Sequence, residues 1–111
     1  MSKKIKAIIK RPDERYGHVS WISDTLENLQ RTVGGYIEAV PIGLFSVAGE
    51  PVQLLVICDE EGRLKGKEPN CQLDGVDFVG EICLVGGKGE EFTDVPIAWG
   101  EYKRLVNGPL L

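Results

Sequence analysis

The chain has 111 residues, of which 42% are hydrophobic and 27% are charged, a composition typical of a single globular domain spanning residues 1–111. Its formal net charge of −4 argues against a general nucleic-acid binder, because such proteins need a cationic surface to release counterions from phosphates. No segment approaches the run of about 18 apolar residues that a transmembrane helix requires.

The three cysteines, Cys58, Cys71 and Cys83, are far apart in the sequence. Cys58 and Cys83 lie within apolar runs, where a reduced thiol behaves as a small hydrophobic side chain. An odd number without close pairs does not indicate a disulfide framework. We therefore expect a reducing compartment, the cytoplasm.

Residues 3–11 (KKIKAIIKR) predict a strand with one solvated, basic face. Side chains on a strand alternate between its two faces, and here apolar and basic residues alternate with only Ile8 breaking the pattern. Pro12 ends the strand because proline cannot donate to a ladder. The apolar face consists of Ile5, Ala7 and Ile9, and the basic face of Lys4, Lys6 and Lys10.

Residues 24–33 predict a helix. Asp24 is a suitable N-cap, and Glu27 three residues later completes a capping box. The spacing of Leu26, Leu29 and Val33 gives the helix one apolar stripe. Gly34-Gly35 then ends the helix, because glycine adopts the left-handed C-cap conformation without strain.

The second half of the chain predicts three more strands and a second helix. Residues 36–42, 51–59 and 78–87 read as strands, and the apolar character of both faces of 51–59 favours a central position. Residues 86–91 (GGKGEE) form a hairpin turn. A helix that begins near Ala98 ends at residues 107–109 (NGP). The fold class is therefore α+β, with a mixed, mostly antiparallel sheet of about four strands and two helices.

No pattern of residues indicates catalysis or metal binding. His18 is the only histidine, so any nucleophilic site built on an imidazole would have to use it, and no nucleophile-elbow pattern accompanies the serines. The cysteines lack the short spacing of a zinc site, and residues 59–61 lack that of an EF-hand. Residues 86–89 (GGKG) lack the spacing of a phosphate loop. We expect no enzyme, no metal and no cofactor.

A basic strand followed directly by an aromatic and polar loop is the one feature that suggests a ligand. Positive charge beside aromatic rings suits an anionic, ring-bearing molecule such as a nucleotide, because each group recognises a different part of it. The alternative is a solvated strand face, with the rings of Tyr16 and Trp21 folded into the core. The candidate ligand-binding residues here are Lys10, Arg11, Tyr16, His18 and Trp21.

The stretches TLENLQRTVGGYIEAV (25–40), DEEGRL (59–64), EPN (68–70), VGEICLVG (79–86) and EFTDVPI (91–97) resemble the family of domains of unknown function DUF3846. Among the residues of its motif, the resemblance makes the polar or amphipathic Tyr36 and Asn70 further candidates for ligand binding. An asparagine amide can pair with a base or ribose edge, and it can equally cap a turn. Gln30 and Glu61 are polar residues of the same motif.

The resemblance also implies a context of bacteriophages and mobile elements, mostly of Firmicutes. Small non-enzymatic proteins of such elements often antagonise host defence. A similar role for this chain is inferred by analogy and not from any of its residues. We expect a cytoplasmic homo-oligomer that sequesters a nucleotide-derived immune signal. The alternative is an inhibitor that docks on a host defence protein through an acidic surface or the apolar segment 44–47. An enzyme that degrades such a signal is a third possibility.

Overall fold

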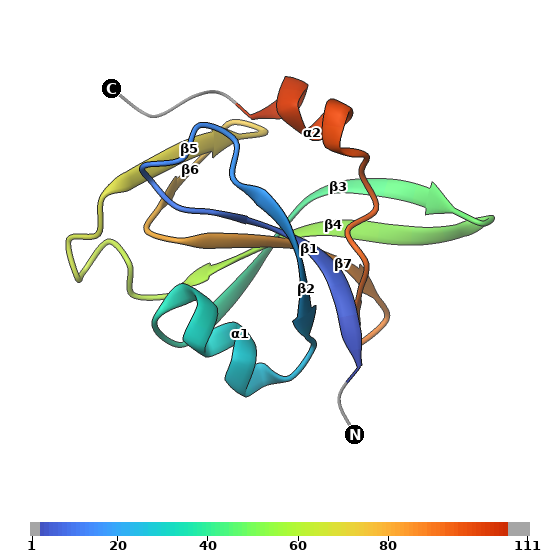
Figure 1. Cartoon of the computed structure of the whole chain (residues 1–111), viewed down its shortest axis with the longest axis horizontal. Helices are drawn as coiled ribbons and strands as arrows, with labels where there is room; N and C mark the ends of the chain where they lie inside the picture. The colour runs from blue at the N-terminus through green and yellow to red at the C-terminus, as the bar shows by residue number, and fades with distance from the viewer. Residues whose placement is uncertain (1–2, 107–111) are drawn as a thin grey trace.

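The structure, a computed structural model, describes residues 3–106 and contains two antiparallel sheets and two helices within them (Figure 1). The larger, six-stranded sheet has the order β2-β1-β7-β4-β3, with β8 paired to β7, and β5 and β6 form a separate hairpin. The predicted α+β class is confirmed, with more strands than expected. The elements are β1 (Lys4–Lys10), β2 (His18–Ser23), α1 (Leu26–Val33), β3 (Ile37–Val47), β4 (Glu50–Asp59), β5 (Pro69–Leu73), β6 (Val76–Val79), β7 (Ile82–Lys88), β8 (Glu91–Thr93) and α2 (Trp99–Leu105).

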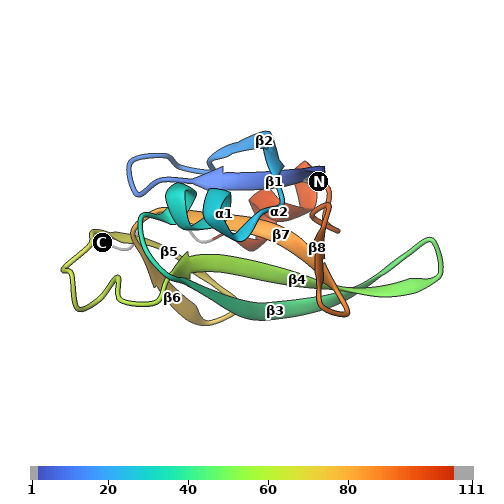
Figure 2. The ribbon, with the colours of Figure 1, turned by 90° about the horizontal axis from the view of Figure 1, so that it is seen from below.

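Both faces of the large sheet are covered, and each cover encloses its own apolar cluster. Helix α1 packs on one face, where Leu29 and Val33 meet Ile5 and Ala7 of β1. Helix α2 and the β5–β6 hairpin cover the other face, on which Ile8 lies (Figure 2). Ile8, the exception in the alternating pattern of β1, is therefore buried because its face is also covered.

Strand β4 lies between β3 and β7, as predicted from its two apolar faces. Its side chains alternate between the two apolar clusters. Leu54 and Val56 belong to the cluster on the α2 side, and Leu55 and Ile57 to the cluster on the α1 side. The partner strand β3 is longer than predicted and continues to Val47. A register shift between Pro41 and Gly43 allows this continuation.

Helix α1 begins one residue later than predicted. Thr25, not Asp24, is the N-cap, and its Oγ1 accepts a hydrogen bond from the backbone N–H of Asn28 at 3.2 Å. The Asp24 carboxylate instead accepts from the backbone N–H of Lys3. The shifted start leaves Leu26 exposed, so the predicted apolar stripe is reduced to Leu29 and Val33. Gly34 ends the helix in the left-handed conformation, as predicted.

The sequence prediction missed strands β2, β5 and β8, and it did not separate β6 from β7. Strand β2 was read as a loop because its apolar residues fall on both faces, with Val19 and Trp21 on one and Ile22 on the other. The predicted strand 78–87 is divided at Gly80, whose φ of 72° ends β6 before β7 begins. A single apolar run in the sequence therefore supplies strands to two different sheets.

Helix α2 begins after Ala98, close to the predicted start. Its Tyr102 is fully buried, whereas Trp99 is partly buried, with the two ring centroids 5.4 Å apart. The predicted stop at residues 107–109 lies outside the described residues. Neither helix in the described part of the chain has the length and apolar character needed to cross a membrane.

Replacement of Gly35 by alanine tests a close contact that positions α1. A Cβ at Gly35 would lie 2.5 Å from Asp59 Oδ1, whose side chain is buried, so we expect Gly35→Ala to lower the free energy of unfolding by about 2 kcal/mol through overpacking. Gly100→Ala is the matched control, because no atom lies within 4 Å of its Cβ and alanine favours a helix. Urea denaturation measures both, and equal effects would contradict the contact.

Candidate functional site

The structure does not bring the seven candidate ligand-binding residues together in one place. Lys10 and Asn70 are buried together, whereas Arg11, Tyr16 and His18 lie around the loop that joins β1 to β2. Trp21 and Tyr36 are exposed but lie at opposite edges of the large sheet, on β2 and immediately before β3. The expectation that all seven residues line one ligand site is therefore wrong.

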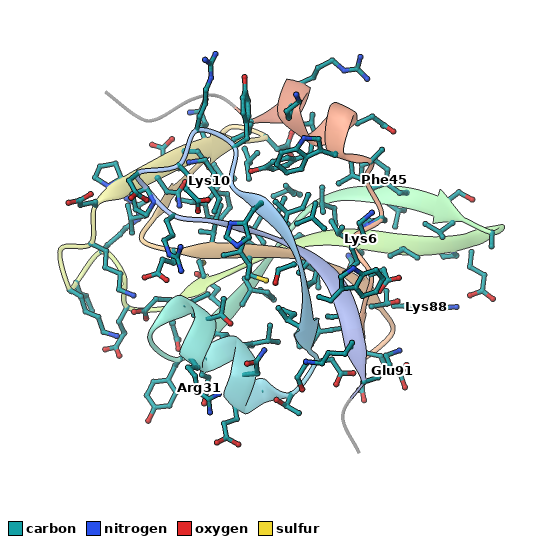
Figure 3. All side chains as sticks on the ribbon, in the orientation of Figure 1. Lys6, Lys10, Arg31, Phe45, Lys88 and Glu91 are labelled. Atoms are coloured by element: carbon teal, nitrogen blue, oxygen red, sulfur yellow. The ribbon has the colours of Figure 1, made fainter. Side chains whose placement is uncertain are left out.

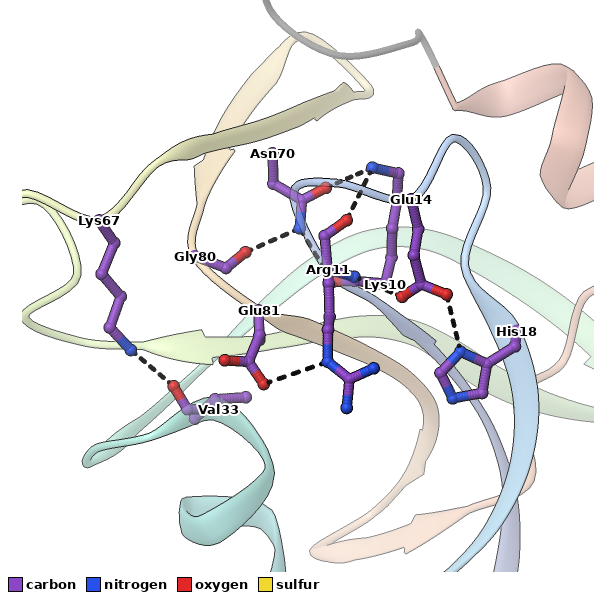
Figure 4. Close-up of polar contacts among 9 residues, drawn as sticks. All are labelled: Lys10, Arg11, Glu14, His18, Val33, Lys67, Asn70, Gly80 and Glu81. Atoms are coloured by element: carbon purple, nitrogen blue, oxygen red, sulfur yellow. Dashed lines mark hydrogen bonds and ion pairs between the residues drawn. The ribbon is translucent and has the colours of Figure 1, made fainter.

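Lys10 and Asn70 form a buried polar pair that is saturated by the protein (Figure 4). Lys10 Nζ donates to Asn70 Oδ1 at 2.7 Å, and Asn70 Nδ2 donates to the backbone oxygens of Lys10 and Gly80 at 2.9 and 2.7 Å. Burial lowers the pKa of Lys10 below its ordinary value. Both side chains are fully buried, so their predicted contact with a ligand is corrected to a structural role.

The basic face of β1 is solvated at only one end. Lys4 is exposed and Lys6 partly so, but Lys10 lies beneath the β5–β6 hairpin. Figure 3 shows Lys6 and Lys10 well apart along the strand. The alternation of the sequence placed these lysines on one face correctly, and the prediction failed for Lys10 because another element covers that end.

The loop after β1 is held together by charged groups of the protein. Arg11 Nε lies 3.9 Å from Glu81, and His18 Nδ1 lies 3.0 Å from Glu14, which also accepts from the backbone N–H of Arg11 (Figure 4). Although partial burial opposes ionisation, the contacts with Arg11 and His18 hold the pKa of Glu14 below its usual value. Arg11 and His18 therefore already have anionic partners.

Tyr16 is partly buried, and cationic groups already lie over its ring. Arg15 Cζ is 5.1 Å and Lys103 Nζ 5.6 Å from the ring centroid. The backbone oxygen of Tyr16 accepts a hydrogen bond from the buried Tyr102 hydroxyl at 2.5 Å, which ties the loop to α2. Tyr16 corresponds more closely to the alternative of an aromatic ring packed against the core.

Trp21 is 60% exposed and lies directly opposite Lys6 in the register of β1 and β2. Lys4, two residues before Lys6, is on the same face, because side chains two apart on a strand share a face. Neither lysine forms an ion pair through its Nζ with another residue of the range 3–106. We call these three residues, Lys4, Lys6 and Trp21, the β1–β2 surface.

Asp59 forms a second polar centre, at the end of β4. Its buried carboxylate lies 2.7 Å from Lys65 Nζ and 2.9 Å from Lys67 Nζ, and Lys67 Nζ also donates to the last backbone oxygen of α1, that of Val33, at 2.7 Å. Despite the cost of burial, these partners hold the pKa of Asp59 well below its usual range. The acidic segment 59–61 is thus anchored through its first residue.

The cysteine thiols are poorly reactive, and the described residues contain no group of side chains suited to bind a metal ion. Burial raises the pKa of Cys58 and Cys71 to about 11 and that of Cys83 to about 12, so all three thiols are protonated at neutral pH. All three are free. Within residues 3–106, no three His, Cys, Asp or Glu side chains are grouped to bind a metal ion.

A hollow of about 350 Å³ between β3, β4 and β6 was not anticipated from the sequence. Its floor includes Val40, Cys58 and Phe78, and its rim carries more acidic than basic side chains. Glu38 lies within the stretch 25–40 that resembles the family, but the sequence predicts residues 78–87 as one strand and does not separate β6 from β7, so nothing in the sequence placed the two walls together. The charged residues that line the hollow are Glu38, Asp59, Glu60, Arg63 and Asp77.

The fold and these surfaces define a small α+β domain built on an antiparallel sheet, with a basic and aromatic surface near one edge and an acidic hollow near the other. The chain belongs to the DUF3846 family, a domain of unknown function that it matches over residues 5–107. The match confirms the resemblance inferred from the motif. No curated protein and no solved structure matches the chain.

Substitution of Asn70 tests its structural role. Asn70→Leu removes a partner from a buried ammonium group and from two buried carbonyls, so we expect a loss of about 3 kcal/mol in the free energy of unfolding. The double variant Lys10→Met/Asn70→Leu should recover part of this loss, because it removes the buried charge as well. Urea denaturation measures both, and a single variant as stable as the wild type would refute the assignment.

Proposed function

We propose that this protein is a non-enzymatic binding protein that sequesters an anionic, nucleotide-derived signal on its β1–β2 surface. The observation that carries the proposal is the pairing of an exposed indole, Trp21, with Lys6 directly opposite and Lys4 beside it. An indole face stacks on a nucleobase, and ammonium groups form charge-assisted hydrogen bonds with phosphate. Lys10 and Asn70 are not part of this proposed site, because both side chains are buried.

Binding without turnover agrees with the chemistry of the side chains. The three thiols have raised pKa values, so they are protonated and poorly nucleophilic at neutral pH. A protein that only sequesters its ligand needs neither a nucleophile nor a general base. A counter-defence role in the cytoplasm of a host cell is the proposed setting, supported by the mobile-element context that the family resemblance implies.

The proposal includes a homo-oligomer. The β1–β2 surface lies on a two-stranded edge and offers one face to a ligand, whereas most small-molecule sites enclose the greater part of their ligand. A second copy would supply the opposite wall. The two larger hollows, of about 350 and 480 Å³, do not serve this purpose, because acidic residues dominate their charged linings and would repel phosphate.

Fluorescence of Trp21 tests the proposal directly in a Trp99→Phe background, where it is the only tryptophan. We expect a panel of cyclic dinucleotides and ADP-ribose derivatives to include a molecule that quenches this signal at micromolar protein. Lys4→Glu/Lys6→Glu should weaken that binding at least about tenfold, since each charge-assisted contact contributes roughly 1.5 kcal/mol.

The matched control is Arg31→Glu/Arg104→Glu, which makes the same change in net charge on the two helices. An equal loss of binding in this variant would show a general charge effect and count against the surface. Absence of binding by every member of the panel would refute the proposal. Light scattering of the same samples measures the number of subunits.

A second candidate function is inhibition of a host protein through the tip of the β3–β4 hairpin. The tip exposes Leu44, at 71% of its surface, and Val47, whereas Phe45 on the side facing α2 is partly buried (Figure 3). Leu44 and Val47 are three residues apart on β3 and so lie on opposite faces of the hairpin, and exposed aliphatic side chains on a projecting hairpin can contribute to a protein contact.

A pull-down from host lysate tests this candidate. We expect the wild type to recover one partner in stoichiometric amount and Leu44→Ser/Val47→Ser to lose it, because the variant removes the apolar contacts and leaves the turn intact. Lys4→Glu/Lys6→Glu serves as the control and should retain the partner. Recovery of the same proteins by the wild type and the tip variant would argue against the hairpin tip.

A further inference from the structure

The outer edge of β3 is open to another strand. β3 ends the order of the large sheet, so one side of it pairs with β4 and the other pairs with no strand of the described chain. Figure 2 shows β3 as the outermost strand of this sheet. An unpaired edge presents backbone donors and acceptors that an incoming extended segment can use.

The register determines which residues present those groups. Glu60 N–H donates to Tyr36 O at 2.8 Å, and the register continues with Ile37 opposite Asp59. In an antiparallel pair, residues that bond to the partner alternate with residues whose N–H and C=O point away from it. Tyr36 bonds inward, so the backbone groups of Ile37 and Ala39 point outward.

Pro41 occupies the next outward position. Proline has no N–H to donate, and its place on an edge strand with the nitrogen facing outward is the one that the ladder tolerates. The register shift follows immediately, between Pro41 and Gly43. Pro41 and the register shift therefore interrupt the edge, and its first uninterrupted part, at the start of β3, presents the backbone groups of Ile37 and Ala39.

The hollow of about 350 Å³ lies beside this short edge. Glu38 and Val40, which flank Ala39, line the hollow, so both face the side covered by the β5–β6 hairpin. Leu64, 86% exposed, and Val76 add apolar surface at its rim. A strand added along Ile37 and Ala39 would place alternate side chains over this hollow.

The charges around the hollow favour a basic occupant. The charge of Asp59 is neutralised by Lys65 and Lys67. The other three acidic residues that line the hollow, Glu38, Glu60 and Asp77, share one basic neighbour in its lining, Arg63. The guanidinium of Arg63 is itself held by the backbone oxygen of Asp77 at 2.8 Å. An incoming residue opposite Glu38 gains from a positive charge, as cross-strand pairs of opposite charge do.

We infer that the edge of β3 binds a basic, extended segment of another protein as an added strand. A lysine or arginine of that segment pairs with Glu38, and an apolar side chain two residues away covers Val40 and the floor of the hollow. Backbone hydrogen bonds to Ile37 and Ala39 hold the segment. Specificity comes from the alternation of basic and apolar side chains on the face above the hollow.

A second copy of this chain is not the occupant. Symmetric pairing of two β3 edges about Glu38 would place two Glu38 side chains opposite each other and bring two acidic rims together, which like-charge repulsion opposes. The inference is independent of the proposed anion binding, because β3 and β2 are the two outer strands of the sheet order. Either proposal can fail without the other.

A synthetic peptide of alternating lysine and valine, labelled with fluorescein, is the probe. We expect it to bind the full-length protein by fluorescence anisotropy and to slow hydrogen exchange at the Ile37 and Ala39 amides, measured by ¹⁵N NMR. Ala39→Pro should weaken binding about fivefold through loss of one hydrogen bond, and Ala39→Val, which retains the N–H, should not. Glu38→Lys should weaken it about tenfold by placing like charges opposite each other.

Urea denaturation checks that each variant is folded. The Ala39 N–H points away from β4, so we expect the proline to leave that ladder intact. A peptide with glutamate in place of lysine should bind the Glu38→Lys variant more tightly than it binds the wild-type protein. Equal binding of the lysine peptide by wild type, Ala39→Pro and Glu38→Lys would overturn the inference. Protection of the Ile37 and Ala39 amides by protein concentration alone would also overturn it, because the occupant would then be a second copy.

Discussion

The buried contact between Lys10 Nζ and Asn70 Oδ1 joins the two sheets of this protein. The Asn70 amide also donates to the backbone oxygens of Lys10 and Gly80, which fixes the end of β1 against the start of the β6–β7 connection. Few other side chains could replace Asn70 in these contacts. Without this pair, a buried ammonium and two carbonyls would lack partners, each at a cost of about 1–3 kcal/mol or more. The position of the β5–β6 hairpin over the large sheet depends on it.

Asp59 provides a comparable constraint on the opposite side of that hairpin. Through Lys65 and Lys67 it connects the end of β4 to the loop before β5, and Lys67 continues the connection to the last turn of α1. Asp59 itself lines the hollow beside β3. The same polar contacts that stabilise the fold therefore shape one of its two candidate surfaces.

The two edges of the large sheet differ in chemical character. Near β2, unpaired lysines lie beside an exposed indole, whereas near β3 acidic side chains surround an apolar floor. The acidic excess of the chain is thus unevenly distributed. Because the two charged surfaces lie at separate edges, the two proposed partners, an anionic small molecule and a basic protein segment, would not compete.

Local pattern determined much of this protein from the sequence alone: the α+β class, the first strand, the body of α1 with its glycine stop, the central position of β4 and membership of its family. The structural features in this list follow from side-chain periodicity and capping, which act over a few residues, and the family follows from its sequence motif. The separation of the faces of β1 was also correct. Only the tertiary structure decided that Lys10 and Asn70 are buried, that Trp21 stays exposed and that Glu38 borders a hollow. The reason is that burial depends on which distant segment covers a face, and the pairing of residues as far apart as 10 and 70 leaves no periodic trace in either segment.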